Sequence, residues 1–458
     1  MSQTTQVPTL GENKMGTMPL GKLLTNMAVP LAAAMLVQAL YNIVDSIYIS
    51  RISESAVTAL SLAFPVQNLQ IGFATGIGVG VNSMVSKSLG QGNQEQANRT
   101  AGNGIVLMLI AVGLFMLFGI FGSHAYYDIQ SDVEETVSGG TIYTMICCVG
   151  TLGIFVEVLG ERLLQSSGRA VYSMITQTVG AVINILLDPV LIFGYFGLPA
   201  MGIAGAALAT VIGQWVAAGL AVFFNIRYNP EVQFGKKYLG LQKDAALPIL
   251  TVGIPSIVMM GIGSVLNFGM NWILQGFNET ATGVFGIYYK LQSFFFMPIM
   301  GLNNASISIL AYNYGAGRPD RITGTLKRSC VAAFCIMMLG LAAFQLIPDV
   351  LLGIFKPSEE FLRIGRSALG IISFHFPIAA FCIALGASFQ ALGNGLYSTI
   401  TSLCRQLIVL LPVAYLLSLT GEVTAVWWAF PIAEVVSLIA TLIFFIRIYR
   451  KKIKPMMR

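Results

Sequence analysis

The sequence predicts an all-α membrane protein whose twelve transmembrane helices form two six-helix lobes related by a pseudo-two-fold axis along the membrane normal. Three observations predict this fold: apolar runs recur along the chain, basic residues favour alternate connecting segments, and the two halves repeat each other. Of the 458 residues 55% are hydrophobic and only 10% charged, far below the quarter that soluble domains carry. This composition leaves no room for a separate soluble domain.

The expected spans are apolar runs of roughly 20 residues or more, the length that crosses a bilayer. They are residues 21–49, 56–86, 101–122, 136–158, 171–194, 202–225, 246–274, 281–311, 328–347, 363–386, 396–418 and 424–447. These spans divide the chain into a cytoplasmic N-terminal tail (1–19), a first lobe (20–226), a cytoplasmic linker (227–245), a second lobe (246–449) and a basic cytoplasmic tail (450–458). The polar first tail has no apolar core before a cleavage site, so a signal peptide is not expected.

Lysine and arginine gather in every second connecting segment. The basic set comprises Lys14, Lys22, Lys87, Arg99, Arg162, Arg169, the run from Arg227 to Lys243, the run from Arg318 to Arg328 and the C-terminal run from Arg447 to Arg458. Because such residues are retained on the cytoplasmic side, we expect a multi-pass protein of the inner membrane with both termini in the cytoplasm. Topology and anionic lipid also explain the net charge of +6, and no nucleic-acid partner is expected.

An internal repeat relates the two halves of the chain by one constant offset and needs no gap. It pairs Pro30 with Pro255, Asn42 with Asn267, Glu54 with Glu279, Gln67 with Gln292, Gly76 with Gly301, Ser83 with Ser308, Gly90 with Gly315, Gly92 with Gly317, Gln165 with Gln390, Gly168 with Gly393, Tyr172 with Tyr397, Ser173 with Ser398 and Thr176 with Thr401. Six helices is an even number, so both halves enter the membrane in the same direction. Two parallel lobes of this kind suit alternating access.

Charged residues inside the spans are the candidates for chemistry, since a charge at mid-bilayer costs roughly 2.5 to 3.5 kcal/mol. They are Asp45, Glu157, Asp188, Lys290, His375, Arg405 and Glu434. The deepest charges of the first lobe are acids, whereas the second lobe also holds bases. An acidic lobe without a base needs a bound cation or a proton, because low dielectric disfavours an isolated carboxylate.

The predicted ion-coupling site consists of Asp45, Asn184, Asp188 and Thr210, with Na⁺ possible at the first three. Asn184 and Asp188 are four residues apart and share a helix face. Proline at 189 frees a backbone carbonyl nearby, and oxygen ligands suit sodium or a proton. Structural alternatives remain: Asp45 bonded to Asn42 or Gln38, Asp188 capping a kink, and Asn184 joining helices.

The candidates for a substrate cleft are Gln38, Asn42, Gln67, Lys290, Gln292, Met297, His375, Arg405 and Glu434. An ion pair of Glu434 with Lys290 or Arg405 is the simpler interpretation of the charges in the second lobe. His375 in an aromatic run is typical of a packing histidine, and Met297 could face lipid or core instead of a repackable cleft.

Several motifs occur in the order typical of one transporter family. They are Pro30, Gln38, Asn42 and Asp45 in the first span, Ser86 to Asn93, Ala311 to Arg318, and Gln165 and Gly168 with Gln390 and Gly393. From Lys22 to Ile448 the chain resembles the multidrug and toxic compound extrusion (MATE) family. The resemblance implies cation-coupled export of amphipathic, often cationic compounds, with Asp45, Asn184 and Asp188 matching the acidic cluster of the first lobe. Asn267 and Asn271 stand where the NorM-like branch carries an acid, so no coupling site is expected in the second lobe.

The sequence thus favours an antiporter driven by Na⁺ or H⁺, with no other cofactor. No nucleotide-binding loop follows the glycine-rich stretches, so no ATPase subunit is expected. A flippase for lipid-linked glycan precursors is the alternative, and it would make Lys290 and Arg405 essential. An enzyme is not expected, because the chain has two histidines and no His/Asp cluster. The substrate, the choice of ion and the oligomeric state stay open.

Overall fold

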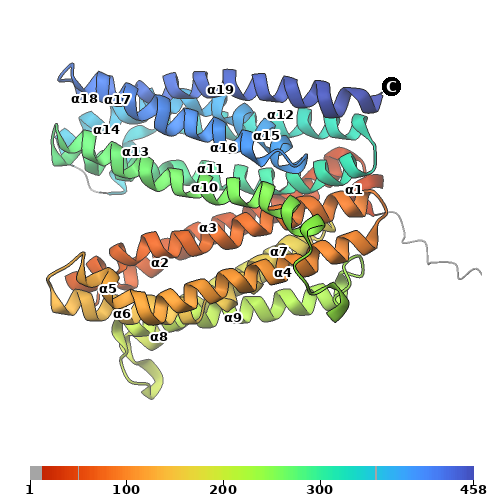
Figure 1. Ribbon diagram of the computed structural model, residues 1–458. Helices are drawn as coiled ribbons and strands as arrows, with labels where there is room; N and C mark the ends of the chain where they lie inside the picture. The colour runs from red at the N-terminus through yellow and green to blue at the C-terminus, as the bar shows by residue number, and fades with distance from the viewer. Residues whose placement is uncertain (1–12, 50, 356–357, 458) are drawn as a thin grey trace, which may run out of the picture.

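The computed structural model describes residues 13–49, 51–355 and 358–457, and almost all of them are helical (Figure 1). The first half contains α1 (Lys14–Thr17), α2 (Leu20–Ile49), α3 (Glu54–Gly90), α4 (Gln94–Leu117), α5 (Ser123–Asp128), α6 (Glu134–Val149), α7 (Leu152–Ser166), α8 (Ala170–Phe193) and α9 (Gly202–Tyr228). The second half contains α10 (Lys243–Gln275), α11 (Glu279–Gly315), α12 (Pro319–Leu346), α13 (Pro348–Gly353), α14 (Glu359–Ile372), α15 (Phe376–Ala391), α16 (Gly395–Leu403), α17 (Leu411–Ser418), α18 (Val423–Val426) and α19 (Ala429–Ile448). Short π-helical or 3₁₀ segments join or extend several of these helices.

The predicted all-α fold of twelve spans in two lobes is confirmed. Within the described ranges, ten helices or helical runs are long and apolar enough to cross a membrane, and α6 with α7 adds a span bent by 44°. Helix α3, with 37 residues, completes the twelve.

The prediction that Arg162 lies in a connecting segment is wrong. Helix α7 continues to Ser166, and Arg162 is inside it, 7% exposed, donating to Gln165 Oε1 at 3.0 Å. The helix runs past the arginine because the following leucines pack in the core of the first lobe. An arginine whose guanidinium has a hydrogen-bond partner can therefore lie inside a helix, even where the position of the charge in the sequence predicts that the helix ends before it.

The internal repeat recurs in the details of the structure. Helices α3 and α11 each have 37 residues, and they begin at equivalent positions of the repeat. Ser53 and Asn278 cap them, each accepting a hydrogen bond from the backbone N–H three residues later. The same two side chains donate to Glu135 and Glu360, both at 3.4 Å, and these two acids are also equivalent in the repeat. The two lobes are therefore two copies of one packing scheme.

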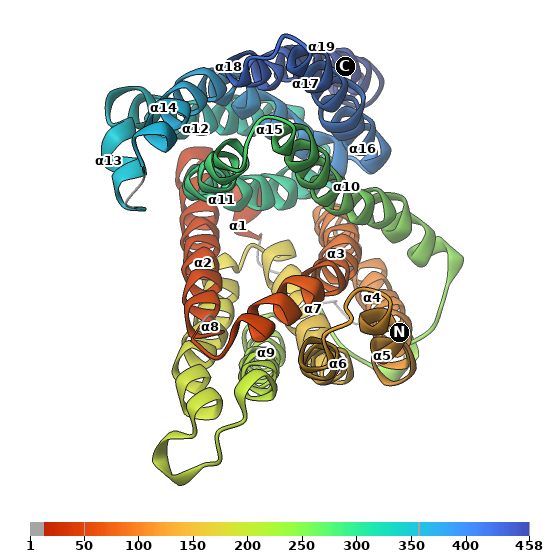
Figure 2. The same ribbon diagram turned by 90° about the vertical axis from the view of Figure 1, so that its left-hand side faces the viewer.

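The two lobes contact each other through α3 with α10 and through α11 with α2. Figure 1 shows the lobes converging toward the end where α1 and the C-terminus lie and diverging toward α5 and α13. Figure 2 looks onto the diverging end and shows the four contacting helices side by side. At the converging end, a Cβ on Gly90 would clash with the Tyr312 carbonyl, and a Cβ on Gly315 with the Lys87 carbonyl. Glycine at these equivalent positions allows the backbones to touch.

Residues 13–18, which we call the N-terminal bridge, join the two lobes at the converging end. Asn13 Nδ2 donates to the Ser167 carbonyl of the first lobe at 3.0 Å. Arg321 of the second lobe donates to the carbonyls of Met15 and Met18 at 3.0 and 2.8 Å. Met15 is fully buried between them. Part of the predicted N-terminal tail is thus packed against both lobes.

Candidate functional site

In the interior of the first lobe, Asp45 and Asp188 have carboxylate oxygens without a hydrogen-bond partner among the described residues. Asp45 on α2 and Asp188 on α8 lie close enough for the two charges to act on each other. Asp188 is fully buried. Among the described residues, neither oxygen of Asp188 and not the Oδ1 atom of Asp45 has a hydrogen-bond partner, and no ion pair found there includes either acid. In the described part of the chain, no basic residue is therefore paired with either acid.

Asn184 and Thr210 complete the predicted set. Asn184 Nδ2 on α8 donates to Thr210 Oγ1 on α9 at 3.1 Å, and both residues are buried. The amide is thereby oriented so that its Oδ1 atom is left without a partner among the described residues. The structure brings together all four residues of the predicted ion-coupling site.

Two glycines explain why α8 and α9 approach so closely at this point. A Cβ added to Gly213 would lie 2.8 Å from the Gly180 carbonyl oxygen and 3.2 Å from the Cβ of Asn184. Small residues at such crossings allow helix backbones to come near each other in membranes. The short distance between Asn184 and Thr210 depends on this packing.

The set of unpaired oxygens fits a small hard cation or a proton. Asp45, Asn184 and Asp188 offer carboxylate and amide oxygens, which are ligands for hard cations and poor ligands for soft metals. Within the described part of the chain no group of three or more His, Cys, Asp or Glu side chains is placed to hold a metal ion. Binding of one positive charge would relieve both the repulsion between the acids and the cost of burying them.

Two tyrosines border the acid pair, and sequence reasoning missed them. The Tyr41 hydroxyl is within hydrogen-bonding reach of Thr210 and interacts with the charges of Asp45 and Asp188. Tyr143 on α6 also interacts electrostatically with the carboxyl group of Asp45. Its hydroxyl accepts a hydrogen bond from Gln67 Nε2 at 2.9 Å. The spacing of four residues between Tyr41 and Asp45 places them on one helix face and could have identified the first tyrosine.

Other candidates of the first lobe lie around this site. Gln38 on α2 accepts a hydrogen bond from Gln177 of α8 at 2.7 Å, which ties together the two helices that carry the acids. The side chain of Asn42 lies outside the described part of the structure. Glu157 on α7 is not in the acid pair; it approaches α8 near Gly180 and interacts with the charge of Glu161.

The second lobe pairs its deep charges. Arg405 Nη1 lies 3.4 Å from Glu434 Oε1, so of the two ion pairs that the sequence allows the structure contains this one. Arg405 lies in a π-helical segment (Cys404–Leu410) between α16 and α17. Buried His375 has its Nδ1 atom 2.6 Å from the Ile372 carbonyl and is surrounded by phenylalanine rings. Its surroundings fit a packing histidine.

Three further candidates lie on α11 and are not brought to the acid pair. Lys290 is exposed, and no ion pair found among the described residues includes it. Gln292 and Met297 are half-buried on the same helix. The structure therefore assembles one compact polar site in the first lobe, and the remaining candidates are dispersed.

Several known proteins that are similar to this chain are transporters. Over 92% of this chain and 93% of the relative, the sequence is 24% identical to the FAD transporter of Shewanella oneidensis. It is 26% identical to the probable multidrug resistance protein YoeA of Bacillus subtilis, with 93% of each chain covered. A solved outward-facing structure of a multidrug resistance MATE family transporter superposes with a TM-score of 0.90 at 23% identity, covering 98% of this chain and 99% of the other.

The sequence profile described as MatE matches residues 30–190 and again residues 255–416. The two matched segments begin at Pro30 and Pro255, which are equivalent positions of the internal repeat. Each match covers most of one lobe, and the first includes both unpaired acids. The chain therefore belongs to the MatE family of multidrug and toxic compound extrusion transporters, and it is a multi-pass transport protein, not an enzyme.

Proposed function

We propose that this chain is an antiporter in which Na⁺ or H⁺ binding at Asp45, Asn184 and Asp188 drives export of amphipathic compounds. The observation that carries the proposal is the pair of half-buried Asp45 and buried Asp188 in the first lobe, whose oxygens Oδ1 of Asp45 and Oδ1 and Oδ2 of Asp188 have no partner among the described residues. Thr210 orients the amide of Asn184 in this site. Arg405 and Glu434 of the second lobe offer no comparable excess of negative charge, because these two side chains neutralise each other.

The coupling ion gains energy as it enters the cell, roughly 2.3 kcal/mol per elementary charge for each 100 mV of membrane potential. The ion can drive transport only through a difference in its affinity for the inward-open and outward-open states. Asp45 and Asp188 lie on different helices, α2 and α8, so relative motion of these helices would change that affinity. Helix α2 also contacts the second lobe through α11, which connects the site to the boundary between the lobes.

We place both termini in the cytoplasm. The converging end carries the N-terminal bridge, the C-terminal residues and basic residues such as Lys87 and Arg321, as expected for a cytoplasmic face. With this orientation the lobes diverge toward the outside. Substrate would then leave outward when the coupling ion arrives.

The substrate class is drawn from the family and from the relatives. Two of the relatives are a probable multidrug resistance protein and a FAD transporter, so a substrate panel includes cationic dyes and FAD. A flippase for lipid-linked diphosphates would need free basic groups in the interior. Arg405 is already bound to Glu434, and this pairing favours antiport over the flippase.

Everted membrane vesicles provide the test. Ion-driven uptake of a cationic dye is measured with a sodium gradient and a pH gradient imposed separately, for the unchanged chain and for Asp45→Asn. We expect one gradient to drive transport and the substitution to abolish it. Asp349→Asn is the matched control, because Asp349 is an exposed acid paired with Arg366. Full ion-driven transport by Asp45→Asn would refute the proposal.

A further inference from the structure

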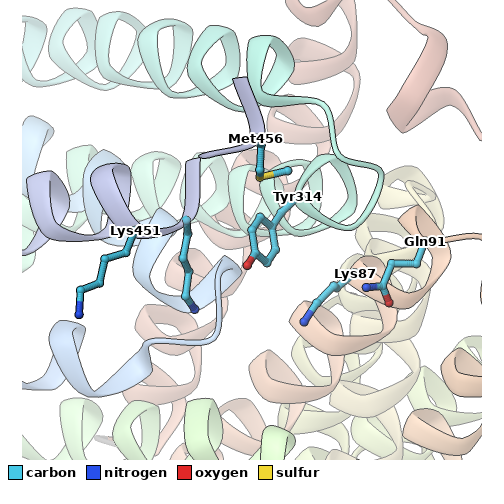
Figure 3. A pocket seen from close by; sticks show the side chains of 6 residues that line it. Lys87, Gln91, Tyr314, Lys451 and Met456 are labelled. Atoms are coloured by element: carbon cyan, nitrogen blue, oxygen red, sulfur yellow. The ribbon is translucent and has the colours of Figure 1, made fainter. Parts of the chain in front are cut away.

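A basic cavity of about 320 Å³ opens at the converging end, away from the acid pair. Figure 3 shows Tyr314 between the side of the pocket that carries Lys451 and the side that carries Lys87. The lining residues are Lys87, Gln91, Tyr314, Lys451, Lys452 and Met456. Three of these six are lysines and none is acidic.

The lysines of this pocket form no ion pair within the part of the chain that the structure describes. Lys87 and Lys452 are near enough for their charges to repel each other, and they lie 5.6 and 6.0 Å from the Tyr314 ring. Lys452 also donates to the Leu392 carbonyl at 2.6 Å, which fixes its position. The arrangement holds positive charge together at a cost that a bound anion would offset.

The pocket spans the boundary between the lobes. Lys87 and Gln91 come from the end of α3 in the first lobe. Tyr314 comes from the end of α11, and Lys451 and Lys452 follow α19, all in the second lobe. It lies beside the contact in which Gly90 and Gly315 allow α3 and α11 to touch. An anion here would bind both lobes in the arrangement in which this end is closed.

We propose that this pocket binds a phosphate-bearing anion that bridges the two lobes. A phosphate offers several acceptor oxygens to ammonium groups, and the tyrosine hydroxyl and the Gln91 amide can donate as well. Lys451 and Lys452 lie near the end of the last apolar helical run, Val423–Met457. Basic residues at the end of a membrane span lie at the level of phospholipid headgroups. The occupant of the pocket is either an anionic lipid headgroup or a soluble phosphate compound.

The first test measures thermal unfolding of the purified full-length protein in a neutral detergent. Short-chain phosphatidylglycerol, short-chain phosphatidylcholine and inorganic phosphate are added separately. We expect phosphatidylglycerol to raise the unfolding temperature in a saturable way and phosphatidylcholine to have no such effect. A shift with inorganic phosphate of the same size and concentration dependence would assign the site to soluble phosphate compounds. Equal responses to phosphatidylglycerol and phosphatidylcholine, or no response to any of the three, would overturn the proposal.

The second test uses variants. Lys87→Gln should raise the half-saturating phosphatidylglycerol concentration about tenfold, because one charged donor is lost. Lys454→Gln is the control: Lys454 is an exposed lysine of the same C-terminal segment that does not line the pocket. Native mass spectrometry counts the lipids retained by each variant, so binding is read independently of stability. If Lys87→Gln retains the lipid with the affinity of Lys454→Gln, the pocket is not the site.

Discussion

The two lobes share one packing scheme and differ in their interiors. Helices α3 and α11 have the same length, equivalent caps and equivalent glycine contacts. In the register of the internal repeat, however, Asp45 corresponds to Met270, Asn184 to Val409 and Asp188 to Val413. The second lobe instead carries the pair of Arg405 and Glu434.

This difference separates two demands on the chain. Residues at the boundary between the lobes serve packing, and both copies of the repeat keep the glycine at which α3 and α11 touch, Gly90 and Gly315. Residues inside each lobe are free of that symmetry, and only the first lobe keeps buried acids without a partner among the residues that the structure describes. Unpaired buried polar groups reduce stability, so their presence in one copy is typical of a functional site.

The largest expected effect comes from giving the first lobe the residue of the second. Asp188→Val should lower ion-driven efflux at least about a hundredfold, since coupling energies run to roughly 3 kcal/mol. The same change should leave the unfolding temperature equal or higher, because it removes a buried carboxylate without a partner. Efflux in vesicles and thermal unfolding in detergent are measured on the same preparation. Retained efflux would show that the acid pair is not the coupling site.

The ion pair of the second lobe should matter for stability and not for coupling. Glu434→Gln leaves Arg405 without its partner and should reduce the free energy of unfolding by about 2 to 3 kcal/mol. Removing both charges with Arg405→Met and Glu434→Leu should restore most of that stability and keep the efflux. If the stable double variant exports nothing, charged residues of both lobes are needed for transport. The proposed difference between the two lobes would then be wrong.

The glycine contact between the lobes tests the shared part of the scheme. Gly90→Ala and Gly315→Ala should each cost about 2 kcal/mol, because the added methyl group meets a backbone carbonyl of the other lobe. Gly113→Ala on α4 is the control, since no atom lies within 4 Å of its added Cβ. Thermal unfolding should show equal losses for the two contact variants. If the two variants lost different amounts of thermal stability, the contacts at Gly90 and Gly315 would not be equivalent in the two lobes.

The smallest expected effect concerns the N-terminal bridge. Arg321→Gln removes hydrogen bonds to Met15 and Met18 and should weaken the bridge by about 1 kcal/mol. Hydrogen exchange of residues 13–18 should then become faster. Arg328→Gln should leave it unchanged, because the guanidinium of Arg328 donates within its own helix, to the Gly324 carbonyl. Equal exchange in both variants would show that Arg321 does not hold the bridge.

Much of the site could be predicted because an intramembrane carboxylate is costly and therefore conspicuous in a sequence. Asp45, Asn184, Asp188 and Thr210 were found by their residue types, spacing and family resemblance. Tyr41 and Tyr143 were missed because tyrosine is common in such helices and its partners come from other helices. Arg162 was assigned to the wrong environment, since a charge in sequence gives no information about its hydrogen-bond partner.

The sequence by itself determined the twelve spans, the internal repeat and the presence of acids in the first lobe. Hydrophobic periodicity and the cost of buried charge act locally, so they can be read along the chain. Only the tertiary structure decided that α2 and α8 bring those acids together beside Thr210 of α9, that Glu434 pairs with Arg405, and that residues 13–18 pack against both lobes. These features depend on contacts between residues far apart in the chain. Which of those contacts form is decided by the close packing of the folded protein.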